Sequence, residues 1–158
     1  MCIAYLALNA HPDWPLFIAA NRDEFHARPT LTAAPWMNHP DVIAGKDEVA
    51  GGTWLGISRT GRFALLTNFR DLRLQGPEQP VSRGELVKNF LTGSQHADTY
   101  ANAVAQQGHQ YQGFNLIVGQ AAQAVYVGNQ TANPHDIQPL DSGRYVLSNH
   151  LLDTDWAK

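Results

Sequence analysis

Residues 2–24 read CIAYLALNAHPDWPLFIAANRDE and contain two short apolar runs separated by a proline-rich turn. Residues 2–9 and 16–20 are rich in residues that favour strands, and the stretch between them, HPDWP at 11–15, is a turn signal. We therefore expect a β-hairpin that buries at least one face. Antiparallel pairing would bring the start of the chain and the N-R-D-E segment at 21–24 to the same edge of the sheet.

Cys2, the only cysteine in 158 residues, stands at this edge directly behind the initiator methionine. Its small side chain permits removal of Met1, after which the thiol and the α-amino group would belong to one residue. The amine has a pKa of about 8 and the thiol one of about 8.5, so the amine could take the thiol proton directly or through water. The alternative is an inert cysteine, because free cysteine is among the most buried residue types.

Polar residues at three expected strand ends could complete a site around the thiol. Asp23 could accept a hydrogen bond from the N-terminal amine, and Asn21 or Arg22 could fix that carboxylate in turn. Asn68 and Asn149 each follow a strand pattern, and N–H groups there could form an oxyanion hole. Ordinary turn residues and a solvated ion pair would give the same pattern, so both interpretations stay open.

Strand patterns recur on both sides of a helical region. After the hairpin, the expected strands are 53–58, 62–68, 114–118, 123–127 and 144–148. The chain order is therefore strands, two helices and strands again, which is typical of an α+β domain with helices packed on antiparallel sheet. No linker, repeat or low-complexity segment divides residues 1–158, so we expect a single domain.

Two loops and two helices separate these strands. The proline content predicts loops from Phe25 to Pro40 and from Phe69 to Pro80. Residues 82–85 (SRGE) match a capping box at the start of one helix, and Gly93 ends its apolar face. A second helix is expected over 97–106.

The composition limits the kinds of partner that we expect this protein to bind. The net charge is −3 and no basic run occurs, which gives no electrostatic case for nucleic acid or an anionic membrane. No apolar run approaches the roughly 20 residues of a membrane span, and the N-terminus lacks the basic region of a signal peptide. The seven histidines have no metal-binding spacing. We expect a cytoplasmic protein that binds a small molecule and needs no cofactor or metal.

Five motifs occur in order along the chain. They are M-C at the start, N-R-D-E at 21–24, G-G-T-W-L-G at 51–56, T-N-F-R at 67–70 and L-S-N at 147–149. Together they resemble the NRDE family, also called the transport-and-Golgi-organisation family. That family is similar to N-terminal nucleophile (Ntn) hydrolases of the choloylglycine hydrolase and penicillin V acylase type. The resemblance implies a four-layer α-β-β-α sandwich of antiparallel sheets, of which this chain is the N-terminal part, because family members are usually longer.

The resemblance also implies a role for each candidate residue. Cys2 matches the nucleophile, and Asp23 matches the aspartate that positions the cysteine amine. Asn68 and Asn149 match the two residues that contribute the oxyanion hole. The pattern departs at Ala20, where those hydrolases carry an arginine, and neighbouring Arg22 could substitute for it.

Three functions remain open from the sequence. The leading one is a cysteine amidohydrolase that cleaves a non-peptide C–N amide bond of a small molecule. The second is a non-catalytic carrier on the same fold, because the family resemblance points toward haem or acyl-lipid handling. The third is an incomplete domain that is inactive alone. The chain ends soon after a strand, and a homodimer is one way to cover the sheet edge left open before Lys158.

Overall fold

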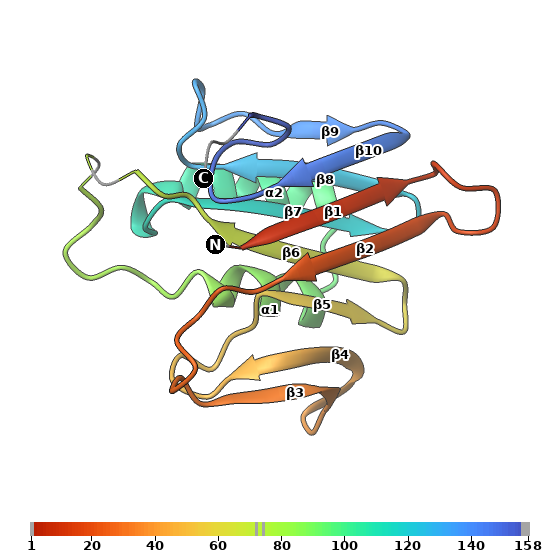
Figure 1. The fold of residues 1–158 in the computed structure, drawn as a ribbon, viewed down its shortest axis with the longest axis horizontal. Helices are drawn as coiled ribbons and strands as arrows, with labels where there is room; N and C mark the ends of the chain where they lie inside the picture. The colour runs from red at the N-terminus through yellow and green to blue at the C-terminus, as the bar shows by residue number, and fades with distance from the viewer. Residues whose placement is uncertain (1, 72, 74, 156–158) are drawn as a thin grey trace.

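A computed structural model of the protein describes residues 2–71, 73 and 75–155. These residues form three layers: a three-stranded sheet, a seven-stranded sheet and a pair of helices. In Figure 1 the three-stranded sheet lies in front of the larger sheet, and the helices lie behind it. The strand pairings are antiparallel, which confirms the predicted α+β class.

The three-stranded sheet contains the predicted hairpin. Its strands are β1 (Ile3–Leu8), β2 (Leu16–Asn21) and β10 (Gly143–Leu147), in the order β10-β1-β2. Ile3 pairs with Asn21 and Ala4 pairs with Leu147, so β1 is bonded along both of its edges. The start of β1 therefore lies beside the ends of both neighbouring strands (Figure 1).

The seven-stranded sheet follows chain order from one edge to the other. Its strands are β3 (Thr30–Trp36), β4 (His39–Asp47), β5 (Leu55–Ser58), β6 (Arg62–Asn68), β7 (Phe114–Gln120), β8 (Gln123–Gly128) and β9 (Gln138–Leu140). The prediction of a loop from Phe25 to Pro40 is wrong, because β3 and the start of β4 occupy most of that stretch. Proline is tolerated there because β3 is the edge strand, and Pro35 sits beside an irregularity in its pairing with β4.

The helices are α1 (Gly84–Thr92) and α2 (Ala97–Gln107), followed by one 3-10 turn, η1 (Gly108–Gln110). Both were predicted within one residue or two, but the capping box is wrong. Arg83, not Ser82, precedes the first helical residue, and no side chain caps this end. Glu85 instead forms an ion pair with Lys88 at 2.9 Å.

Side chains of the large sheet alternate between two buried cores. Ala64, Leu116 and Val118 pack against the apolar faces of α1 and α2. Phe63, Leu65 and Ile117 face the three-stranded sheet, where they meet Ala4, Leu6, Leu8 and Leu147. The central strands β6 and β7 are thus covered on both faces.

The outer face of the three-stranded sheet carries exposed apolar side chains. Ile3, Phe17 and Val146 are exposed, and among the described residues no helix covers them. The described residues therefore form three layers, and the four-layer sandwich stays an expectation from the sequence resemblance. Neither helix in this part of the chain has the length and apolar composition that a bilayer crossing requires.

Arg62 ties the helical layer to the large sheet. Its side chain reaches from β6 to the last turn of α1, where Nε and Nη2 donate to the Phe90 carbonyl at 3.1 and 2.7 Å and Nη1 donates to the Gln95 carbonyl at 2.8 Å. The guanidinium also stacks on the Phe90 ring at 3.9 Å. Burial lowers the pKa of Arg62, and only 6% of the residue is exposed.

We expect Arg62→Leu to lower the free energy of unfolding by about 2 kcal/mol or more, because two carbonyls would lose their donors in a buried place. Urea unfolding measures the change. Arg59→Leu is the matched control, since Arg59 is exposed in the same β5–β6 hairpin and should change the free energy by less than about 0.5 kcal/mol. Equal effects of the two substitutions would contradict this role for Arg62.

Candidate active site

Cys2 and the N-R-D-E segment meet at one edge of the three-stranded sheet, as the hairpin predicted. The Ile3–Asn21 pair is the last of the β1–β2 ladder, so the residues just outside it face each other. The backbone N–H of Asp23 points at the Cys2 sulfur, with 3.4 Å between N and Sγ. The thiol in turn lies 3.9 Å from the Asp23 carbonyl oxygen, and Cys2 is partly buried.

Asn149 joins three separate segments at this edge. Its Oδ1 accepts a hydrogen bond from the Cys2 backbone nitrogen at 3.0 Å. Its Nδ2 donates to the Asn68 carbonyl at 2.8 Å, and its own carbonyl accepts the Arg70 N–H at 2.8 Å. Only 5% of Asn149 is exposed. Of the predicted site residues, Cys2, Asp23, Asn68 and Asn149 are therefore brought together.

A buried amide, Asn115, holds the Asn149 segment against the large sheet. Its Nδ2 donates to the His150 carbonyl at 2.8 Å and to Thr67 Oγ1 at 3.2 Å, while Tyr126 Oη donates to its Oδ1 at 2.8 Å. Sequence reasoning missed this residue. The available signal was a lone asparagine inside the apolar run FNLIV at 114–118, where an unpaired amide would be costly.

The other two predicted site residues have different environments. Asn21 is exposed at the end of β2 and borders a small recess of about 20 Å³. Arg22 stacks over the Trp54 ring at 4.1 Å and approaches Glu24 at 3.4 Å and Asp47 at 3.6 Å. Its positive charge is therefore balanced by two carboxylates.

Asp47 is a second residue that the sequence did not indicate. Its carboxylate forms an ion pair with Arg28 Nη2 at 2.8 Å. Its backbone N–H donates to the Gly52 carbonyl at 2.9 Å, across the turn that contains Gly51 and Gly52. Burial would raise the pKa of Asp47, but Arg28 and the N–H groups of Val49 and Ala50 outweigh it and lower the pKa. Asp47 is thus charged at neutral pH and anchors the arginines beside the thiol.

Two hollows larger than the small recess at Asn21 open at Cys2. The larger has a volume of about 650 Å³ and is lined by Asn68, Asn149, Asp23 and Glu24 together with the thiol. The smaller, of about 250 Å³, extends past Arg22 and Trp54 toward the start of α1. A small molecule in either of these hollows would therefore lie next to Cys2.

The thiol is not activated by its surroundings alone. Burial raises the pKa of Cys2, and the negative charge of Glu24 raises it further. The positive charges of Arg22 and Arg83 lower the pKa, but the net shift is upward. The thiol therefore holds its proton at neutral pH and needs a base in order to act as a nucleophile.

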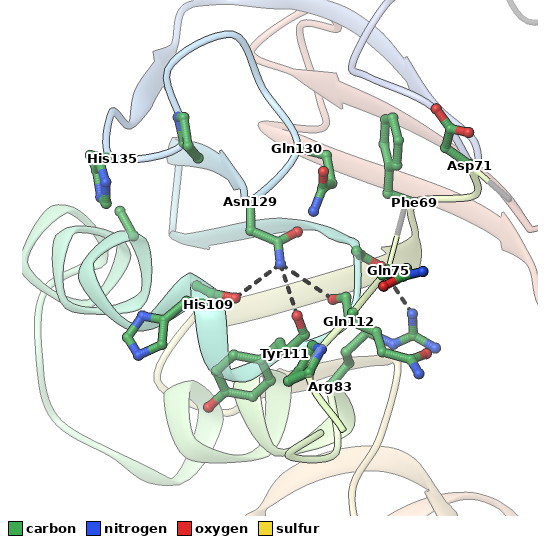
Figure 2. Close-up of a pocket in the computed structure, with 16 residues that line it drawn as sticks. Phe69, Asp71, Gln75, Arg83, His109, Tyr111, Gln112, Asn129, Gln130 and His135 are labelled. Carbon is green, nitrogen blue, oxygen red and sulfur yellow. Dashed lines mark hydrogen bonds between the residues drawn. The ribbon is translucent and has the colours of Figure 1, made fainter. Parts of the chain in front are cut away.

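A third hollow, of about 630 Å³, lies next to these two and does not include Cys2. Figure 2 shows Asn129 in its wall, with Nδ2 directed at the carbonyls of Gly108, Tyr111 and Gln112 at 3.0 to 3.4 Å. Asp71, at another side of this hollow, is paired with Arg73, whose hydrogen bonds lower the pKa of Asp71 to about 2. Among the described residues, no three His, Cys, Asp or Glu side chains are grouped to hold a metal ion.

The fold and this edge define a two-sheet α+β protein. Its one cysteine lies at a ligand-sized hollow, which Asp23, Glu24 and the buried amide of Asn149 also line. The chain belongs to the family Transport and Golgi organisation 2, whose model matches residues 1–158. This confirms the family that the five motifs predicted.

Three relatives illustrate the match. The chain is 41% identical over 170 residues to Transport and Golgi organization protein 2 homolog from Homo sapiens and 40% identical over 172 residues to Transport and Golgi organization 2 homolog from Mus musculus. It is 29% identical over 174 residues to Transport and Golgi organization protein 2 from Drosophila melanogaster. Each alignment covers all of this chain and 60% or 61% of the relative, so the chain spans about 60% of the length of these relatives.

The raised thiol pKa predicts a particular pH dependence for protein that retains Met1. The thiolate is the reactive form, so the rate of iodoacetamide labelling of Cys2 should still be rising at a pH where the rate for an ordinary thiol has levelled off. The same protein unfolded in urea is the control, and its rate should level off at lower pH. Intact-mass kinetics measure both rates, and a plateau near neutral pH in the folded protein would refute the expectation.

Proposed function

We propose that this protein is a cysteine amidohydrolase of the Ntn type, which cleaves a C–N amide bond of a small molecule after Met1 has been removed. The observation that carries the proposal is the 3.0 Å hydrogen bond between the Cys2 nitrogen and Asn149 Oδ1. That nitrogen becomes the α-amine after processing, and it is already fixed beside the sulfur at an open hollow. An N-terminal nucleophile requires this combination of a held amine and an accessible thiol.

The layer order supports the same proposal. Two antiparallel sheets packed face to face, with helices on the outside of one, agree with the β-β-α portion of the Ntn sandwich that the motifs resemble. The relatives are longer than this chain, and in this proposal their additional residues would supply the remaining layer. The proposal also assigns the same amidohydrolase activity to the longer relatives.

In the first step, the neutral α-amine of Cys2 takes the thiol proton and the thiolate attacks the amide carbon. The carbonyl electrons move to oxygen, and the negative charge is stabilised by an oxyanion hole at Asn68 and Asn149. Asn149 Nδ2 carries two hydrogens, of which the Asn68 carbonyl takes one, so the proposal assigns the second to the oxyanion. The ammonium then gives its proton to the leaving nitrogen, the C–N bond breaks, and an amine departs.

In the second step, the amine accepts a proton from water, and the resulting hydroxide attacks the thioester carbon. The C–S bond breaks, a carboxylic acid leaves, and the thiol regains its proton. Asp23 is assigned the role of a carboxylate that holds the charged form of the amine, while Arg22 and Asn21 support the segment that carries it. The net reaction adds one water across the amide bond.

A carrier is the second candidate, and the raised pKa of Cys2 favours it. A protonated thiol lining a hollow of about 650 Å³ is suited to bind a ligand without reacting with it. The relatives' names refer to transport and Golgi organisation, which agrees with carriage of a small molecule. Haem or an acyl lipid would be the cargo in this alternative.

Release of the Cys2 amine tests the proposal directly. The protein is prepared with an N-terminal extension that a protease removes to leave Cys2 first, and a panel of N-acyl amides is assayed before and after cleavage. We expect hydrolysis only after cleavage, and only with Cys2 intact, because the mechanism needs both the amine and the thiol. Cleaved Cys2→Ala is the control. Equal turnover by Cys2→Ala, or by the uncleaved protein, would exclude this mechanism.

Asn149→Ala should lower kcat/KM by about 10²-fold or more, the usual cost of removing an oxyanion-hole donor. Asn89→Ala is the matched control, because Asn89 is an exposed amide on α1 and should leave kcat/KM unchanged. Unfolding curves of both variants distinguish loss of chemistry from loss of fold. Full activity in a folded Asn149→Ala protein would remove Asn149 from the mechanism.

A further inference from the structure

Arg83 stands where the three hollows meet. Together with Gln112 it lines the two larger hollows that contain Cys2 and also the third hollow, shown in Figure 2. A ligand bound in any of these three hollows can therefore lie next to this guanidinium. Arg83 directly precedes α1.

The charge of Arg83 is not balanced as the charges of its neighbours are. Arg22 lies within 4 Å of Glu24 and Asp47, and Arg28 binds Asp47 at 2.8 Å. Among the described residues, no carboxylate lies within 4 Å of the Arg83 guanidinium. Its hydrogen bond from Nη1 goes instead to a neutral acceptor, the Gly113 carbonyl, at 2.9 Å.

Arg83 is also held in place and partly desolvated. The bond to Gly113 fixes Nη1, and the guanidinium has five N–H groups in all, on a residue that lines the three hollows. Burial lowers the pKa of Arg83, while the nearby Cys2 and Glu24 oppose this effect. A positioned guanidinium with no carboxylate within 4 Å among the described residues is suited to bind the carboxylate of a ligand.

We propose that Arg83 is a specificity-determining residue that binds a carboxylate group of the substrate while the amide carbon lies at Cys2. The substrate class is then an N-acyl amide that carries a carboxylate near the scissile bond. This inference rests on the proposed function for the reaction, but the recognition of a carboxylate beside the thiol does not depend on turnover. The third hollow supplies room beyond the guanidinium, and Asn129 in its wall is already used by backbone groups.

Alkylation of the single thiol measures this recognition without any substrate. Iodoacetate and iodoacetamide both transfer a methylene carbon to sulfur with loss of iodide, but only iodoacetate carries a carboxylate. The ratio of their rate constants cancels the fraction of thiolate, which affects both reagents equally. We expect the ratio in the folded protein to exceed that of the urea-unfolded protein by about tenfold, the scale of one charge-assisted hydrogen bond.

Three variants separate Arg83 from general electrostatics. In Arg83→Gln the ratio should fall to the value of the unfolded protein, and Arg83→Lys should keep most of the preference because it keeps the charge. Arg70→Gln is the matched control, since Arg70 lines the larger hollow but is exposed, and it should change the ratio by less than about twofold. An unchanged ratio in Arg83→Gln, or a loss as large in Arg70→Gln, would overturn the proposal.

A second measurement uses the unaltered protein, in case Arg83 variants fold poorly. Glutarate should slow iodoacetamide labelling of Cys2 in a saturable manner, and glutaramide, its neutral diamide, should not. Equal protection by both compounds, or none by glutarate, would overturn the proposal. Carboxylate selectivity without amide hydrolysis would refute only the proposed function, whereas hydrolysis of acidic and neutral amides at equal rates would refute only the role of Arg83.

Discussion

The pairing of β1 along both of its edges is the constraint on which the site depends. β2 and β10 run antiparallel to it, so both end where β1 begins, and Cys2, Asp23 and Asn149 arrive at one place. The inner face of this small sheet packs Leu6, Leu8 and Leu147 against the large sheet, which fixes its position relative to β6 and Asn68. Apolar packing between the sheets therefore determines the geometry of polar groups at their edge.

The groups around the thiol have opposite effects on its ionisation. Burial and Glu24 disfavour the thiolate, while Arg22 and Arg83 favour it. Most of these side chains are tied by other contacts: Arg22 by Trp54 and Asp47, and Asn149 by Asn68 and Cys2. The surroundings are thus largely preorganised, and a proton acceptor supplied by processing at the N-terminus would change the state of the sulfur without rearranging its neighbours.

The sequence predicted the hairpin, the family and the meeting of Cys2 with N-R-D-E, because apolar runs and turn residues are local signals. It missed β3 and β4, since prolines that normally mark loops are accommodated at an irregular sheet edge. It also missed Asn115, Asp47 and Arg83, whose importance comes from partners far along the chain. Arg83 in particular lies inside the S-R-G-E pattern that predicted a capping box. The structure shows that α1 begins at Gly84 and that no side chain caps this end of the helix.

The bond between the Cys2 nitrogen and Asn149 joins positions 147 residues apart. Closing a loop of that length costs about 4 kcal/mol of chain entropy beyond a constant term, and β10 must be in place before it can form. During synthesis the N-terminal residue leaves the ribosome first, yet its nitrogen stays unanchored until nearly all of the described chain has followed. The contact that holds the Cys2 nitrogen can therefore form only after β10 and Asn149 have been synthesised, and in the proposed mechanism the removal of Met1 has that interval in which to precede it.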